Sequence, residues 1–250
     1  MATLIRARGL INHLNDDLQK VCPTLTMEIG LFSEMVQRDD VSFYEKNIVD
    51  PLYLLCLNWR GKCISSISCK ISGKEMEISS KTHKDHEGKK YNLLLRSAII
   101  LLAKHMRPIT QVVSRAINPI SAFSMVKYFN AYSEDLNNYL EENGIEPDKV
   151  KLEDIQNFFD EKSDLGMDME LTEEEEAELM MKNEDFGNIT TLVVDLNNEK
   201  TIQKTKTTFS DTLSRIRCAE GKGRRNTHRG KTMGHKRGNK LKKHNTKRRY

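Results

Sequence analysis

The run from Glu77 to Tyr132 constrains the fold most, because strand-like and helix-like segments alternate along it. It reads EISSKTHKDHEGKKYNLLLRSAIILLAKHMRPITQVVSRAINPISAFSMVKYFNAY. Residues 91–105 are apolar on nearly every side over about four turns, so this helix must pack against a sheet. Residues 110–117 are strand-like, and Pro119 then suits the first position of a second helix. The run therefore predicts strand, loop, helix, strand and helix in that order.

Three short strands are predicted just before the loop, and turns that contain glycine separate them: 51–59, 63–71 and 76–82. This spacing is typical of an antiparallel meander. The expected fold class is α/β, with a mixed, mostly antiparallel central sheet flanked by helices.

The remaining segments have weaker patterns. Apolar spacing predicts an amphipathic helix over 4–20, a strand over 24–29 and a short helix over 33–46. Residues 134–187 are acidic, with helical patches such as 152–159. Residues 189–208 have strand-like patterns on both sides of two asparagines, and this arrangement predicts a hairpin.

The net charge of +4 hides two oppositely charged parts. Residues 221–250 contain 13 Lys and Arg and no acidic residue, whereas the first 220 residues hold 27 basic and 36 acidic side chains. With so few apolar residues, the basic segment is expected to stay disordered, because burial cannot offset its chain entropy. Such a segment attracts phosphates, so its expected partner is nucleic acid, bound weakly, or an acidic protein surface. A role in solubility alone is the alternative.

Cysteine usage and hydropathy favour an intracellular protein, cytoplasmic or nuclear. The five cysteines have neither CxxC nor zinc spacing, so reduced, buried thiols and no metal are expected. No apolar run reaches the roughly 18 residues that cross a bilayer, and the N-terminus lacks an apolar signal core. We expect no membrane contact.

The loop before residues 91–105 is the strongest candidate for a binding site. Free N–H groups and the dipole at a helix N-terminus favour an anion. Gly88 can take conformations that other residues avoid, and Lys89 and Lys90 add positive charge. The pattern predicts a phosphate site, and an ordinary polar loop is the alternative.

These residues resemble the GNAT superfamily of acetyltransferases. In that family a strand enters a loop of the form Val-x-Pro-x-Tyr-Arg-Gly-Lys-Gly-x-Gly before an apolar helix, and Thr82 to Asn92 takes those places here. Asn118 stands where an Asn opens the helix that flanks the acyl-CoA. The resemblance covers residues 24–132. The composition and the basic end are also similar to those of proteins from large DNA viruses, which would place the protein in a host cell.

The resemblance implies acetyl-CoA as co-substrate. The strands 77–82 and 111–117 would splay into a V-shaped gap that receives the pantetheine arm, with the pyrophosphate on the loop. The implied cofactor-binding residues are Ser79, Ser80, Lys81, Thr82, Gly88, Lys89, Lys90, Tyr91, Asn92 and Asn118.

For catalysis, the resemblance implies a base on the strand and a tyrosine acid on the last helix. Glu77 is the candidate base and Tyr128 the candidate acid for the leaving thiolate. His83 and His86 are alternative bases, and Tyr132 is an alternative acid. Packing or solvated roles for these residues remain open.

Three residues depart from the family signature. Glu87 takes the Arg or Gln place and would put negative charge near a pyrophosphate. Lys90 takes the first Gly place, where a side chain crowds the backbone, and Asn92 takes the second. These departures weaken the expectation of ordinary acetyl-CoA binding.

Four parts are expected: 1–133, a GNAT-like acyl-CoA-binding core; 134–187, an acidic, partly helical segment; 188–218, a hairpin that completes the sheet and a short helix; 219–250, a disordered basic tail. The predicted function is transfer of acetyl from acetyl-CoA to a primary amine of a protein or small molecule. The alternative is a non-catalytic binding module of the same fold, whose basic tail contacts nucleic acid or an acidic partner.

Overall fold

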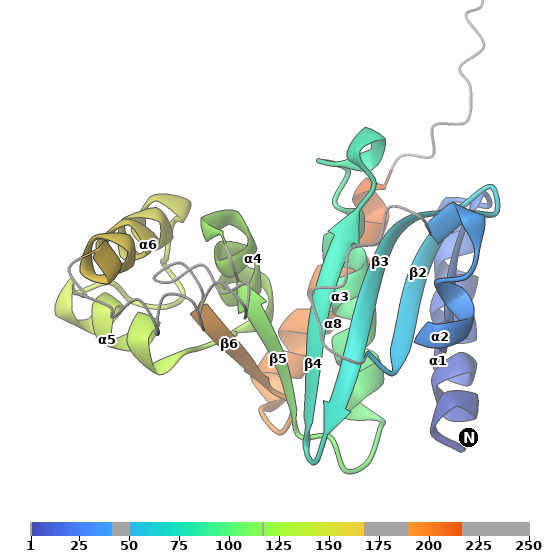
Figure 1. Cartoon of the computed structure of the whole chain (residues 1–250), viewed down its shortest axis with the longest axis horizontal. Coiled ribbons are helices and arrows are strands. Elements are labelled where there is room, and N and C mark those ends of the chain that lie inside the picture. Colours follow the sequence, from blue (N-terminus) through green and yellow to red (C-terminus); the bar gives the residue numbers. More distant parts are fainter. Residues whose placement is uncertain (1, 42–50, 117, 168–189, 217–250) are drawn as a thin grey trace, which may run out of the picture. The chain divides into compact units, whose positions relative to one another are not determined.

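A six-stranded mixed sheet forms the centre of the protein (Figure 1). The computed structural model describes residues 2–41, 51–116, 118–167 and 190–216. The strands follow the chain order across the sheet: β1 (Leu25–Leu31), β2 (Tyr53–Trp59), β3 (Lys62–Ser72), β4 (Glu75–Thr82), β5 (Gln111–Ala116) and β6 (Thr190–Asp195). Only β4 and β5 are parallel, and the other neighbours are antiparallel. The expected fold class is confirmed.

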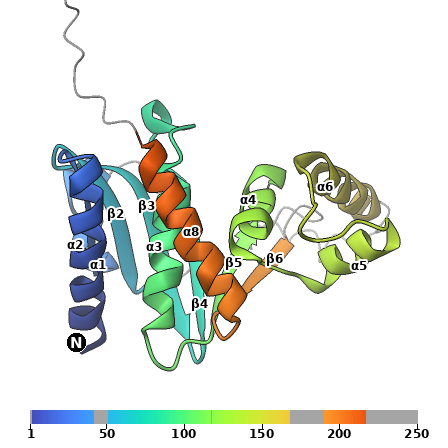
Figure 2. The same cartoon turned by 180° about the vertical axis from the view of Figure 1, so that it is seen from behind.

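Helices cover both faces of this sheet. They are α1 (Ala2–Val21), α2 (Phe32–Met35), α3 (Tyr91–Lys104), α4 (Pro119–Phe129), α5 (Glu134–Glu142), α6 (Leu152–Met167) and α8 (Glu199–Arg215), with 3-10 turns η1 (Asp39–Val41) and η2 (Lys84–His86). Figure 2 shows α1, α3 and α8 side by side on one face. The short α2 lies on the opposite face, against β1 and β2.

Strand β2 is apolar from Tyr53 to Leu57 and is buried on both faces. Leu55 and Leu57 join the main core with α1 and α3. Leu54 and Cys56 point the other way and pack against Phe32 of α2. A continuous apolar run, rather than strict alternation, is what burial on both faces requires.

The second half of the predicted hairpin is wrong. Its first half forms β6, which completes the sheet beside β5, but residues 199–215 form helix α8. Asn198 caps this helix by accepting hydrogen bonds from the N–H groups of Lys200 and Thr201. The buried residues of α8 recur every three or four positions, a helical period: Thr201, Thr205, Thr208, Phe209, Thr212 and Leu213. Its many threonines favour strands by propensity, and tertiary burial overrides that preference.

The acidic segment contributes to the core. Leu136 and Leu140 of α5 and Ile155, Phe158 and Phe159 of α6 are buried there. Of the short helix expected over 33–46, α2 and η1 are present, and 42–50 lie outside the described residues. Residues 168–187 of the acidic segment and the basic segment 221–250 also lie outside the described residues, so what is expected of them stays a prediction.

The cysteine expectation is only partly correct. Cys56, Cys63 and Cys69 are free and buried. Cys22 is disulfide-bonded, so the expectation of reduced thiols throughout is wrong. No helix in the described ranges combines the length and apolarity that crossing a membrane requires.

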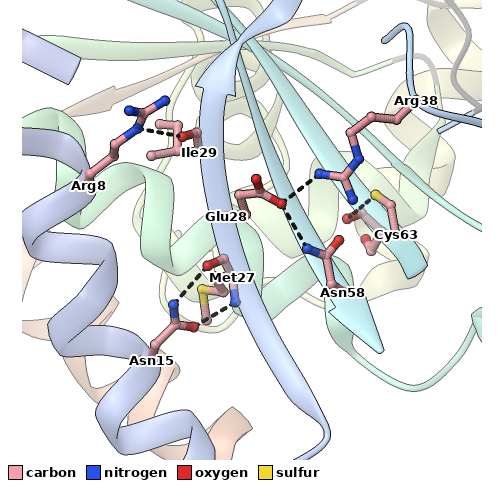
Figure 3. A network of polar contacts seen from close by, with 9 residues as sticks. Arg8, Asn15, Met27, Glu28, Ile29, Arg38, Asn58 and Cys63 are labelled. Carbon is pink, nitrogen blue, oxygen red and sulfur yellow. Dashed lines mark hydrogen bonds and ion pairs between the residues drawn. The ribbon is translucent and has the colours of Figure 1, made fainter. Parts of the chain in front are cut away.

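The outer edge of β1 is closed by side chains of α1 (Figure 3). Asn15 donates from Nδ2 to the Met27 carbonyl at 2.8 Å and accepts from the Met27 N–H at 2.6 Å. Arg8 donates to the Ile29 carbonyl at 3.4 Å. The Asn15 amide therefore takes the place of a further strand and protects an edge that could otherwise pair with another chain.

We expect Asn15→Ala to lower the free energy of unfolding by about 1–3 kcal/mol, because both Met27 backbone groups lose their partner. Urea unfolding measures this. Asn12→Ala is the matched control, since Asn12 is exposed on the same helix. It should be neutral or stabilise by up to about 0.5 kcal/mol, because Ala is the better helix former. Equal effects of the two substitutions would contradict the role of Asn15.

Candidate functional site

Strands β4 and β5 separate in the middle of the sheet. They pair over four positions, from Glu75 opposite Gln111 to Ile78 opposite Ser114. Beyond these, β4 continues to Thr82 along β3, and β5 continues to Ala116 along β6. The predicted splay is therefore present (Figure 1). Within 79–82, every second residue directs its N–H and C=O away from β3 with no described strand to receive them.

The loop after β4 ends at the start of α3, where backbone N–H groups are free. Gly88 has a φ of 73° and Lys90, the N-cap residue, a φ of 63°, both left-handed. The N–H groups of Tyr91, Asn92 and Leu93 have no partner in the described part of the chain. Free donors and the helix dipole at this end favour an anion, as the sequence predicts.

The conformation of Lys90 explains one departure from the GNAT signature. That signature has a glycine at this place, and the backbone here is left-handed, which glycine adopts without steric cost. Lys90 takes the same conformation with a side chain, at a cost of about 1–2 kcal/mol. The loop therefore adopts at Lys90 a conformation that suits a glycine.

Aromatic rings hold this loop in place. The His86 ring centroid lies 5.6 Å from that of Trp59, 6.0 Å from that of His83 and 6.1 Å from that of Tyr91. Burial lowers the pKa of His86, and the positive charge of Lys89 lowers it further. Burial also raises the pKa of Tyr91. His86 is therefore neutral near pH 7 and packs the loop.

The side chains of β4 divide between the two faces of the sheet. Ser80 points to α3, where its Oγ accepts from Asn92 Nδ2 at 2.9 Å. Thr82, on the same side, shares a hydrogen bond of 2.8 Å with Ser65. The side chains of Ser79 and Lys81 alternate to the opposite face with Glu77. Their carbonyls face β3, where they accept from Ser68 Oγ at 3.4 Å and Ser65 Oγ at 3.2 Å, so the backbone groups open to the splay are those of Ser80 and Thr82. Of the predicted cofactor-binding residues, Ser80 and Asn92 are thus directly joined.

Arg96 is a site residue that the sequence prediction missed. It lies in α3 and is only 7% exposed. Its Nη2 donates to Ser80 Oγ at 3.0 Å and to Ser121 Oγ at 2.8 Å, so it links β4 to the first turn of α4. Burial lowers its pKa to about 10, which leaves it charged at neutral pH. The available signal was the single charged residue inside the apolar stretch 91–103.

The predicted base lies on the face of the sheet opposite α3. A pocket of about 310 Å³ opens there, lined by Lys70, Ser72, Glu75, Glu77, Val113, Arg115 and Thr191. Glu77 Oε1 is 3.2 Å from Arg115 Nε, and the glutamate side chain is 24% exposed. Arg115 thus pairs with a carboxylate that solvent still reaches.

The predicted tyrosines are not among the residues that line this pocket. Tyr128 lies near the end of α4 and packs on the core, and its carbonyl accepts from Thr208 Oγ1 at 3.2 Å. Tyr132 is 42% exposed, and its backbone pairs with Val193 of β6. Asn118 caps α4, since its Oδ1 accepts from the Ser121 N–H at 2.8 Å. The structure thus joins Asn118 to the Arg96 cluster but does not bring Glu77 and Tyr128 together.

Within the described residues, no group of three or more His, Cys, Asp or Glu is placed to hold a metal ion. His83 and Asp85 approach one another, with His83 Nδ1 3.7 Å from Asp85 Oδ2. These side chains are 42% and 81% exposed, on the outer side of the loop.

Comparisons with known proteins find only distant likenesses. No family model and no curated protein matches the chain. Among solved structures, a GNAT-family acetyltransferase from Streptococcus pneumoniae is 12% identical over 28% of this chain and 45% of its own, with a TM-score of 0.26. The protein yncA from Salmonella typhimurium, solved with its cofactor acetyl-CoA, is 16% identical over 41% and 76%, with a TM-score of 0.32.

A third solved structure is N-acetylglutamate synthase from Neisseria gonorrhoeae, complexed with coenzyme A and N-acetyl-glutamate. It is 15% identical over 79% of this chain and 34% of its own, with a TM-score of 0.34. This chain thus spans less than half of the streptococcal and gonococcal proteins. These likenesses are too weak to assign an activity.

We expect Lys90→Gly to raise the free energy of unfolding by about 0.5–1 kcal/mol, because it removes the left-handed strain at a small cost in chain entropy. Lys89→Gly makes the same chemical change one residue earlier, where φ is not positive. It should be neutral or mildly destabilising. Thermal unfolding of both variants measures the difference, and the opposite order would show that Lys90 is not strained.

Proposed function

We propose that this chain is an N-acyltransferase that transfers acetyl from acetyl-CoA to a primary amine. The observation that supports this most is the separation of β4 and β5 beside the N-terminus of α3. Unpaired backbone groups in the middle of a sheet call for hydrogen-bond partners, and an extended ligand with amide groups can supply them. A pantetheine arm is such a ligand, and it ends in a pyrophosphate.

In this proposal the pyrophosphate binds the free N–H groups of Tyr91 and Asn92, with Lys89 and Lys90 adding charge. The arm then follows the open edge of β4 along residues 79–82. A backbone N–H of β4 polarises the thioester carbonyl, because a fixed dipole stabilises the charge that develops on oxygen. Glu87, which is exposed, turns away from the phosphates.

The acceptor amine approaches from the face that carries Glu77. Glu77 takes a proton from the ammonium, directly or through water, and the free amine attacks the thioester carbon. The C–S bond breaks as the amide bond forms. The thiolate of coenzyme A takes its proton from Tyr128 of α4 or from water. The acceptor is a small molecule or a protein side chain.

One observation favours a second candidate, a non-catalytic binding module. Arg96 bridges Ser80 and Ser121 beside the separated strands, where the arm would run. The module would use the same fold, with the basic segment 221–250 in contact with nucleic acid or an acidic partner. Ligand binding separates the two candidates.

Thermal unfolding with and without acetyl-CoA tests the cofactor. At about 100 times its dissociation constant, acetyl-CoA should add about 2.7 kcal/mol to the free energy of unfolding. Pyrophosphate at the same concentration is the control and should give a much smaller shift. If acetyl-CoA gives none, the transferase proposal is wrong and the binding module becomes the leading candidate.

Glu77→Gln should lower the rate of coenzyme A release with a panel of primary amines by about 10²–10⁴-fold, since it removes the base. Stabilisation by acetyl-CoA should be unchanged. Glu75→Gln removes a neighbouring carboxylate of the same pocket and should keep most of the activity. An equal loss in both variants would point to the charge of the pocket instead of a base at Glu77.

A further inference from the structure

Arg96 is a buried cation with no counter-ion among the described residues. Its partners in the described part of the chain are the hydroxyls of Ser80 and Ser121, and no described carboxylate forms an ion pair with it. Two hydroxyls do not replace the hydration that a guanidinium loses on burial. An anion beside Arg96 would restore that lost interaction.

The donors of Arg96 are only partly used. Nη2 makes both hydrogen bonds, and Nε is buried without a partner. Nη1 also has no partner in the described part of the chain, but it is not enclosed as Nε is. Oδ1 of Asn92, one turn earlier, is likewise buried and unpaired. Two buried, unsatisfied polar atoms therefore lie where β4 and α3 meet, and Nη1 can donate to an incoming group.

The position of Arg96 indicates which part of a ligand would meet it. Arg96 is five residues into α3, beyond the first-turn N–H groups that suit a pyrophosphate. Its contact Ser80 is two residues beyond Ile78, the last residue of β4 that pairs with β5. The guanidinium therefore lies beside the strand segment expected to hold the thioester.

The two faces of β4 also separate the acyl group from the acceptor. Ser80 and Arg96 lie on the α3 face, whereas Glu77 and its pocket lie on the opposite face. An amine that gives its proton to Glu77 approaches from that opposite side. A carboxylate at Arg96 would then belong to the acyl group and not to the acceptor.

We propose that Arg96 binds a carboxylate at the far end of the acyl group, so that the preferred donor is the coenzyme A thioester of a dicarboxylic acid such as succinate. This inference rests on the proposed transferase function. Glu77 takes one proton from the ammonium, and the free amine nitrogen forms the new bond to the thioester carbon. The C–S bond breaks, and the coenzyme A thiolate leaves and takes up the second proton of the nitrogen through Tyr128 or water. The distal carboxylate takes no part in bond changes and is held by Nη1 of Arg96.

The test compares succinyl-CoA with butyryl-CoA, which has the same chain length but no distal charge, by titration calorimetry. The wild-type chain should bind succinyl-CoA roughly tenfold more tightly or better, as expected for a hydrogen bond between charged groups. Arg96→Gln should abolish this preference while butyryl-CoA still binds. Arg6→Gln, which makes the same change at an exposed site on α1, should keep it.

The chain without ligand gives a second readout. If Arg96 serves an absent anion, Arg96→Met should leave the unfolding temperature unchanged or higher, because it removes an uncompensated buried charge. A clear fall would indicate that the bridge between Ser80 and Ser121 is structural and would overturn the inference. Equal affinity of the wild-type chain for the two thioesters would also overturn it, while coenzyme A binding would stand. If neither thioester binds, the proposed function fails with it.

Discussion

The parallel pairing of β4 with β5 is the constraint on which the site depends. A parallel connection needs a crossover, and α3 provides it, so the helix begins at the same end of the sheet where β4 ends. The strands stop pairing at Ile78 and Ser114, because β4 follows β3 while β5 follows β6. One topological choice thus brings open backbone groups and a helix N-terminus together. Ligands bind at such ends in open α/β sheets generally.

The alternation of side chains along β4 then gives the two faces different chemistry. Toward α3 the strand ends in hydroxyls, and that of Ser80 meets Asn92 and Arg96 in a partly buried region. Away from α3 it carries carboxylates, and Glu77 meets Arg115 in a pocket open to solvent. Water and salt screen the interactions of a charge on the open face more than those of a charge on the partly buried face. The same strand can therefore separate two charged reaction partners.

The sequence predicted the elements whose hydrophobic period is clear and missed those set by tertiary contacts. The meander of β2, β3 and β4, the helix α3 and the strand β5 follow from apolar runs and turns. The first part of helix α8, up to residue 208, was mistaken for a strand because its buried positions there are threonines, whose propensity opposes the structure. Arg96 was missed because a single arginine in an apolar helix reveals its burial only when Ser80 and Ser121, 16 and 25 residues away, are seen beside it.

Several local rules are broken within a short stretch of this fold. The backbone of Lys90 is left-handed, and Nε of Arg96 and Oδ1 of Asn92 are buried without partners. Among the described residues, no strand pairs with the side of β4 that faces β5 over 79–82. None of these features stabilises the chain by itself, and the apolar contacts of α3 with the sheet must offset their cost. Similar features occur elsewhere, with left-handed backbone at Arg60 and Asn130 and buried unpaired atoms in Asn58, Ser66 and Thr190. Those at Lys90, Asn92, Arg96 and residues 79–82 lie along one path from the start of α3 to Ser80. One ligand could pair with all of these groups if it carried an anion at one end, amide groups along its length and a second anion beside Arg96. A rearrangement of any single residue could not.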